Sequence, residues 1–285
     1  MLAHLRKSVL TRMIALIVLF MLVDSVVAGG LSRMVDTTNP FQALLVLVLG
    51  GLAAWGTLRL YRYVINQLEL REPDEIAPEG AGRAVRKGTY IGIALLTLVM
   101  LLIAMFGGYE SLGWGSVWPM LSFAGLMVAV AVIEELVFRA ILFRLLEQMT
   151  GTVGALVGSA LIFGAMHLIN PNATLWGAVS IAVQGGLMLG AIYAVTRNVW
   201  LPIGFHFGWN FAQAGLFGVA VSGSENRGSG LLTSVLDDGP TVVTGGDFGP
   251  EATLFALLSC LIVFLVVLRR VQLRSRTQAR ELAAA

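Results

Sequence analysis

The long apolar stretches of this sequence contain a few ionisable side chains, and their types are those needed for hydrolysis. Burying such a group in a membrane costs several kcal/mol, so each is a candidate for function. A buried carboxylate can act as a general base, and imidazole and amide groups can donate hydrogen bonds to an oxyanion. The ionisable groups are Asp24, Glu134, Glu135, Arg139, His167 and His206, and the amide is that of Asn210.

Their spacing separates the two adjacent carboxylates. Glu135 and Arg139 are four residues apart with the acid first, which is the favourable order for a helical ion pair. Glu134 is five residues from Arg139, about 140° around a helix, and therefore faces elsewhere. The pattern predicts a structural pair and one free carboxylate, Glu134, as a general base. The alternative is a neutralised cluster that only fixes helix packing. Asp24 is expected to be solvated near the outer end of its stretch.

The other groups also occur at helical spacing. His167 follows Phe163 by four residues, and Asn210 follows His206 by four, so each pair shares a helix face. Taken singly, each pair could serve only as hydrogen-bonding groups between helices. Together with a free Glu, they provide a base, an imidazole and two oxyanion donors, which are the parts needed to add water to an amide.

The composition indicates a membrane protein. Hydrophobic residues make up 57% of the 285 residues, charged residues 13%, and the mean hydropathy is +0.82. A soluble domain of this size could not bury so much apolar surface. The net charge of +2 is too small to suggest a nucleic-acid partner. The single cysteine, Cys260, excludes an intramolecular disulfide and a cysteine metal cluster.

Eight membrane-spanning helices are expected from the length of the uncharged stretches. Of the 19 Lys and Arg residues, an N-in and C-in topology puts sixteen in inner loops and only Arg33 and Arg227 outside, with Arg139 inside a span. Residues 1–28, which include His4, could instead be a cleaved signal peptide. The spans are expected near residues 13–30, 37–58, 88–109, 111–133, two within 148–196, 198–224 and 252–268.

Three regions follow from this all-α, polytopic arrangement. Residues 1–110 carry the first three helices and a charged inner loop, 66–87, which has room for a short interfacial helix. Residues 111–270 are expected to form the core that carries the candidate residues, and they include an outer loop, 222–250, that is expected to be irregular or hairpin-like. Residues 271–285 form a basic inner tail.

The depths of the two histidines conflict with straight, fully spanning helices. His167 would lie near the outer end of its helix and His206 near the inner end of its own, about 15 Å or more apart in depth. We therefore expect the connection 168–176, which contains Asn170-Pro171-Asn172, to be sunk into the protein and to line a polar cavity.

The ordered motifs EExxxR from Glu134 to Arg139, FxxxH from Phe163 to His167 and HxxxN from His206 to Asn210 resemble those of a known family. It is the CAAX prenyl protease and bacteriocin-processing (CPBP, or Abi) family of intramembrane endopeptidases. The stretch 244–251, TGGDFGPE, also looks like a loop common in its bacterial members. The resemblance covers about residues 115–270, and each motif alone is weak.

The resemblance implies a role for each matching residue. Glu134 would activate water with the help of His167, His206 and Asn210 would stabilise the oxyanion, and Glu135, Arg139 and Phe163 would support the site. No metal or cofactor is expected, because Asn210 suits an oxyanion better than zinc. The alternative is a zinc ion on Glu134, His167 and His206.

The function that the resemblance implies is an endopeptidase in the plasma membrane, with a membrane-associated or prenylated-type peptide or protein as substrate and lipid as surroundings. The alternatives are a membrane scaffold or immunity-type binding protein and, third, a transporter. The sequence does not identify the substrate, the oligomeric state or the side to which the site opens.

Overall fold

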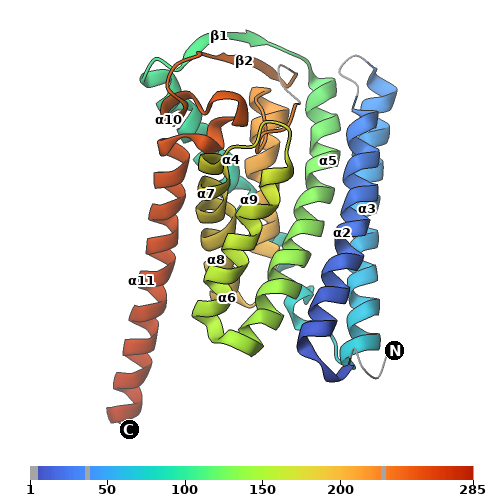
Figure 1. The fold of residues 1–285 in the computed structure, drawn as a ribbon, viewed down its shortest axis with the longest axis vertical. Coiled ribbons are helices and arrows are strands. Elements are labelled where there is room, and N and C mark those ends of the chain that lie inside the picture. Colours follow the sequence, from blue (N-terminus) through green and yellow to red (C-terminus); the bar gives the residue numbers. More distant parts are fainter. Residues whose placement is uncertain (1–5, 36–38, 226–228, 285) are drawn as a thin grey trace.

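The computed structural model describes residues 6–35, 39–225 and 229–284 and is predominantly helical (Figure 1). This confirms the all-α membrane class. His4 and Arg227 lie outside the described residues, as do the side chains of the basic tail. The elements are α2 (Val9–Met34), α3 (Pro40–Glu69), η1 (Asp74–Ile76), α4 (Ala81–Met105), β1 (Tyr109–Trp114), α5 (Val117–Glu135), η2 (Leu136–Phe143), α6 (Arg144–Met166), η3 (His167–Ile169), α7 (Leu175–Ile181), η4 (Ala182–Met188), α8 (Leu189–Thr196), α9 (Trp200–Phe211), η5 (Ala212–Phe217), β2 (Leu232–Leu236), α10 (Thr241–Thr244), η6 (Gly246–Phe248), η7 (Pro250–Ala252) and α11 (Leu254–Ala284).

The long helices run side by side along the long axis of the molecule (Figure 1). The start of α2 and the end of α11 lie at one end, called here the terminal end, and the β strands lie at the other, the ribbon end. Within the described residues, four helical stretches are long and apolar enough to cross a membrane, namely α2, α3, α4 and residues 175–196. The count of eight spans and the N-in orientation remain predictions.

A two-stranded ribbon replaces the expected start of the fourth span. β1 pairs antiparallel with β2, with Leu112 opposite Ser234, so the outer loop 222–250 pairs with a distant segment and is not a hairpin of its own. The helix α5 therefore begins only at Val117, where the Ser116 side chain accepts a hydrogen bond from the Trp118 backbone N–H. The uncharged stretch 111–133 includes residues of β1 because hydropathy alone does not reveal long-range strand pairing.

The inner loop is shorter than the expected 66–87. The helix α3 continues to Glu69, where Leu70 adopts a left-handed conformation with φ 56°, and α4 begins at Ala81. The short helix in this loop is the 3₁₀ turn η1, and its position at the membrane interface remains a prediction. The charges in this region do not break the helices because they pair with one another at the terminal end.

These paired charges form a network that joins four elements. Arg144 on α6 and Arg12 on α2 bind the Glu69 carboxylate at 2.8 and 3.2 Å. Arg71 bridges Glu69 and Glu75, at 2.7 Å from each. Glu69 and Glu75 are 6% and 5% exposed at the side chain, so these pairs are shielded from water far better than surface salt bridges.

Glycines allow α4 and α9 to cross at backbone contact. Gly88 and Gly92 on α4 face Gly204 and Gly208 on α9, and a methyl group added at any of the four would overlap the backbone of the other helix. Small residues at four-residue spacing are the usual means of close helix packing in membranes. Because 204 and 208 lie on the opposite face of α9 from 206 and 210, this crossing turns His206 and Asn210 inward.

Irregular helix geometry occurs in the helices that carry the candidate site. A π-helical segment follows α5, α7 and α9, as η2, η4 and η5. Such segments are frequent at functional sites because they re-aim side chains. Gly151 has a non-helical backbone, φ 73° and ψ 173°, so the chain bends within α6. Residues 152–166 extend only about 22 Å at 1.5 Å per residue, which is less than a hydrocarbon core of about 30 Å.

The crossing of α4 and α9 gives the first prediction. Gly208→Val should destabilise the protein by about 1–3 kcal/mol or more, because the side chain would overlap the backbone of α4. Gly51→Val on exposed α3 has nothing within 4 Å of the new Cβ and should cost less than about 1 kcal/mol. Thermal unfolding in detergent measures both. Equal melting temperatures for the two variants would contradict the crossing.

The charge network gives a prediction about pH. Burial raises the pKa of Glu75, but hydrogen bonds from Arg71 and Tyr61 and the charge of Arg144 outweigh it, so the pKa is lowered below its ordinary 4.5. This contribution to stability is present above pH 4.5 and is lost as the pH falls through the lowered pKa. Glu75→Gln should therefore lower the melting temperature by several degrees at pH 7 and by much less at the lowest pH the protein tolerates. A loss independent of pH would argue against the pairing.

Candidate active site

The centre of the candidate site is the carboxylate of Glu135, which is fully buried on α5. Its Oε2 lies 3.1 Å from Arg139 Nε, so the predicted ion pair is present. Its Oε1 accepts a hydrogen bond from His206 Nδ1 at 2.9 Å, a contact that local spacing did not predict. One carboxylate therefore neutralises the guanidinium and orients an imidazole that is 71 residues away in sequence.

Arg139 is held on two further sides. Its Nη2 donates to the Gly185 carbonyl on η4, and its guanidinium carbon lies 5.0 Å from the centre of the Phe163 ring. The residue is 2% exposed. Arg139 thus contacts α5, α6 and η4, and these elements surround the other site residues.

His206 lies between the two adjacent carboxylates. Because Glu135 only accepts hydrogen bonds, Nδ1 carries the proton in that contact, and Nε2 points toward Glu134, with 3.9 Å between Nε2 and Oε2. The Glu134 side chain is 21% exposed, while that of Glu135 is fully enclosed. The two carboxylates therefore point in different directions, as the spacing predicts. Glu135 points to Arg139, and the side chain of Glu134 is partly exposed.

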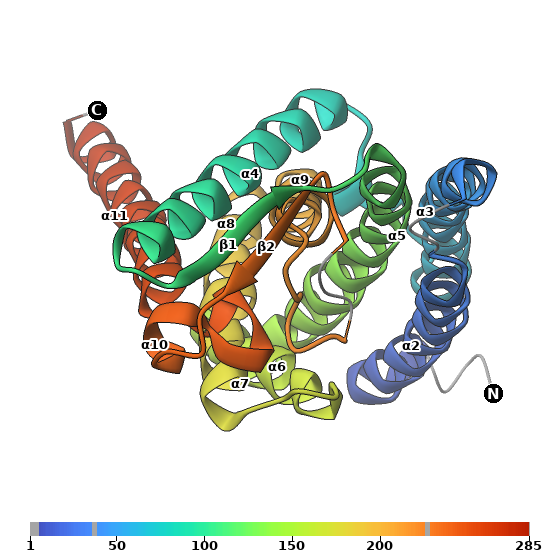
Figure 2. The same ribbon diagram turned by 90° about the horizontal axis from the view of Figure 1, so that it is seen from above.

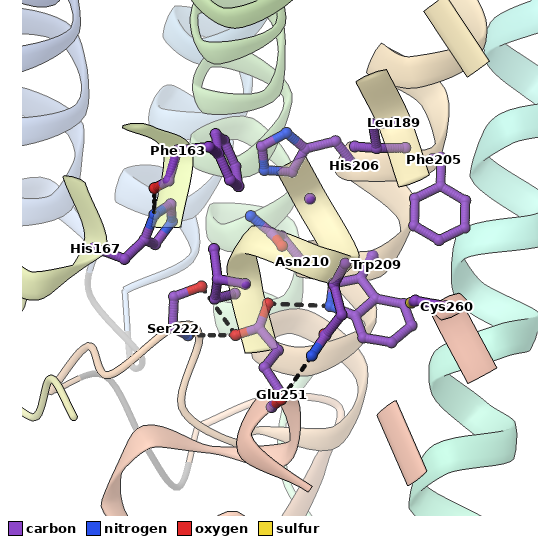
Figure 3. A pocket seen from close by; sticks show the side chains of 13 residues that line it. Phe163, His167, Leu189, Phe205, His206, Trp209, Asn210, Ser222, Glu251 and Cys260 are labelled. Carbon is purple, nitrogen blue, oxygen red and sulfur yellow. Dashed lines mark hydrogen bonds between the residues drawn. The ribbon is translucent and has the colours of Figure 1, made fainter. Parts of the chain in front are cut away.

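His167 is brought to the same place by Phe163. Its Nδ1 donates to the Phe163 carbonyl at 2.8 Å, which leaves Nε2 free. The Phe163 ring is 4.8 Å from the His167 ring and 6.4 Å from the His206 ring, centre to centre (Figure 3). The conflict in depth disappears because α6, bent at Gly151, ends short at Met166.

The connection 168–176 matches its prediction only in part. Asn170 lines a cavity and donates to the Ser222 carbonyl at 2.6 Å. Leu168 and Ile169, however, are 46% and 78% exposed, so most of this connection is not sunk into the protein. Asn170 is thus turned toward the outer loop, while Leu168 and Ile169 face outward.

Two cavities meet at these residues, and Asn210 lines both without a hydrogen bond to any described residue. The smaller cavity, about 30 Å³, has room for a water molecule. The larger, about 350 Å³, also reaches Glu134. Besides His167, His206, Asn210 and Glu134, the larger cavity is lined by Ala28, Gly29, Ser32, Phe123, Leu126, Met127, Val130, Asn170, Ala214, Val221, Ser222 and Ser224.

Two polar residues beside the cavities, Glu251 and Ser222, are not among the site residues that the sequence predicts. Glu251 and Ser222 line the smaller one, and Asn170 borders the larger. Asp24, expected to be solvated, is half-buried and interacts electrostatically with His206 and Glu134. Only Glu251 had a signal, as the last residue of the TGGDFGPE stretch, and a loop acid gives no indication of burial.

The geometry offers little support for the zinc alternative on Glu134, His167 and His206. In the part of the chain that the structure describes, no group of three His, Cys, Asp or Glu side chains is arranged to hold a metal ion. The Nδ1 atoms of both histidines are engaged, one by a carboxylate and one by a carbonyl, but this leaves each Nε2 available to a ligand and does not argue against zinc. Metal independence remains a prediction.

The shared carboxylate gives a prediction about stability. Glu135→Ala should cost about 3–5 kcal/mol, because it leaves the buried Arg139 charge without its partner. The double variant Glu135→Leu with Arg139→Met should recover much of that loss, since it removes both charges and keeps the volume. Thermal unfolding in detergent compares them. A double variant no more stable than Glu135→Ala would show that the ion pair is not the main contribution of these residues.

Comparison with known proteins agrees with the family resemblance. Residues 115–212 match the family described as "Type II CAAX prenyl endopeptidase Rce1-like". The protein named "Putative membrane peptidase YdiL" of Bacillus subtilis (strain 168) is 30% identical over 112 residues, which are 37% of this chain and 43% of that protein. The chain thus spans less than half the length of this curated relative, and no solved structure matches it significantly. The matched segment holds every motif residue from Glu134 to Asn210 and is similar to the Rce1-like family of CAAX prenyl endopeptidases.

Proposed function

We propose that this protein is an intramembrane endopeptidase of the plasma membrane that hydrolyses a peptide bond by a glutamate-activated water. The observation that carries the proposal is the position of His206 between two carboxylates, 2.9 Å from Glu135 and 3.9 Å from Glu134, on a cavity shared with His167 and Asn210. Peptide hydrolysis needs a base and an oxyanion site within reach of one carbonyl.

Glu134 is the proposed general base. It is the carboxylate open to the larger cavity, and it has no Lys or Arg partner among the described residues. A water beside it would lose a proton to the Glu134 carboxylate as the water oxygen attacks the peptide carbonyl, and Glu134 would then pass that proton to the leaving nitrogen as the C–N bond breaks. The free Nε2 of His167 faces the same cavity and would hold that water in line.

His206 and Asn210 are the proposed oxyanion donors. With Nδ1 donating to Glu135, Nε2 can donate to a substrate oxygen only when the ring is positively charged, and two carboxylates beside it favour that form. The Asn210 amide, which has no partner among the described residues, points to the same space one helical turn away. Both donors stand ready before the negative charge develops, which is how such sites lower a barrier.

The substrate class follows from the wall of the larger cavity. Apolar residues of α5, including Phe123, Met127 and Val130, and small residues of α2 face the polar site residues across it. This combination suits a peptide whose backbone meets the polar side while apolar side chains or an attached lipid lie against α5. We propose a membrane-associated peptide or protein as substrate and leave prenylation unassigned.

The central test is Glu134→Gln, which keeps the shape of the side chain and removes the base. Cleavage should fall by about 10²–10⁴-fold. Peptidomics of membranes from cells with wild type or variant should show peptide ends that vanish with the variant, and purified protein in liposomes should reproduce the cleavage of the corresponding peptide.

Two controls accompany this test. Glu72→Gln, at a side chain that is 73% exposed, should leave cleavage unchanged. A zinc chelator should also leave wild-type cleavage unchanged, whereas loss of activity that returns with added zinc would favour a metal mechanism. Full cleavage by Glu134→Gln would overturn the proposal and favour a binding or transport role.

A further inference from the structure

Glu251 is a second enclosed carboxylate, and the proposed chemistry does not use it. It lies in η7, at the end of the outer loop, and is 3% exposed. Among the described residues, no Lys, Arg or His forms an ion pair with it. Its oxygens accept hydrogen bonds instead, Oε1 from Trp209 Nε1 at 3.1 Å and Oε2 from the backbone N–H and hydroxyl of Ser222 at 2.6 and 2.9 Å (Figure 3).

These hydrogen bonds connect Glu251 to Asn210 on one side of the candidate site and to His167 on the other. Trp209 is the residue before Asn210 on α9, so its bond to Glu251 fixes the rotation of that helix where Asn210 projects. Ser222 accepts a hydrogen bond from Asn170 through its carbonyl, at 2.6 Å. The Asn170 backbone N–H in turn donates to the His167 carbonyl at 3.3 Å.

The backbone around Glu251 is also hydrogen-bonded to α7 and η4. Gln184 on η4 donates to the Glu251 carbonyl at 2.7 Å, and Trp176 donates to the Ala252 carbonyl at 2.7 Å. These two bonds tie the turn η7 to the helices that follow His167. The Glu251 side chain is the part of this turn that reaches α9.

From this geometry we propose that Glu251 is a positioning residue, which sets Asn210 at the correct distance from His167 by tying α9 to the outer loop. The inference rests on the proposed function. A carboxylate is required because it only accepts hydrogen bonds, and here it faces three donor groups. An amide in its place would turn a donor toward one of them.

The position of Trp209 provides a matched pair of variants. If the substituted side chain keeps the two hydrogen bonds from Ser222, Glu251→Gln turns its amide N–H₂ toward Trp209 and removes the hydrogen bond between residues 209 and 251. Trp209→Phe removes the same hydrogen bond by deleting its donor on α9. Glu251→Gln keeps the volume nearly constant, whereas Trp209→Phe also removes one ring of a buried side chain, so thermal unfolding of both variants is measured beside kcat. If the bond between Trp209 and Glu251 positions Asn210, the two variants should have the same effect, and the double variant should add little to either.

The experiment measures kcat and KM in liposomes on the peptide identified with Glu134→Gln. Glu251→Gln and Trp209→Phe should each lower kcat about tenfold with little change in KM, since a small misplacement of a donor weakens transition-state binding. In an Asn210→Ala background, Glu251→Gln should change kcat less than about twofold, because the residue that it positions is gone. Glu110→Gln, an exposed acid at the ribbon end, should not alter kcat.

Hydrogen exchange on the same proteins gives a readout that does not depend on cleavage. Glu251→Gln should speed exchange in residues 168–174 and 220–224 and leave the exchange of α3 unchanged. Unchanged exchange in both segments would overturn the proposal, as would a full tenfold further loss of kcat in the Asn210→Ala background. If wild type cleaves no peptide, the proposed function fails, and exchange alone decides whether Glu251 ties the loop to the helix. If Glu251→Gln does not fold, Trp209→Phe takes its place in every comparison.

Discussion

The sharing of one buried carboxylate between an arginine and a histidine is the interaction on which the candidate site depends. Glu135 binds Arg139 at 3.1 Å and His206 at 2.9 Å, inside a bundle that offers almost no other charge. A buried ion pair contributes little net stability, yet removing one partner is costly, so the three groups stay together. Their geometry fixes α9 against α5 and leaves the neighbouring Glu134 facing the cavity.

Close packing on the other side of α9 makes this arrangement possible. Gly204 and Gly208 let α9 lie against the backbone of α4, and the opposite face then presents His206 and Asn210 to the cavity. In Figure 2, which looks down on the ribbon, α9 lies within the ring of other helices and beneath the two strands. His206 and Asn210 on this helix are 8% and 7% exposed, and such enclosure by protein is the condition under which irregular backbone and charge are tolerated at membrane depth.

Individual residues show which features of the site can be predicted from the sequence. The spacing of Glu135 and Arg139 predicts their ion pair, and the same reasoning predicts that Glu134 faces away from it; both arrangements occur in the structure. The roles assigned to Glu134, His167, His206 and Asn210 remain proposals, although the structure gathers all four around one cavity. Hydropathy failed at β1 and at the boundaries of the inner loop, because strand pairing and ion pairing across the chain are not local properties.

The amino-acid sequence by itself determined the class of solvent, the predominance of helix and the residues that can do chemistry, since composition and i, i+4 spacing are properties of short segments. Only the tertiary structure decided which of those residues meet. The contact between His206 and Glu135 and the enclosure of Glu251 by Ser222 and Trp209 join segments tens of residues apart. Such contacts depend on how helices bend and cross, for example at Gly151 and at Gly208. The bending and crossing result from many packing contacts across the chain, which a short motif does not contain.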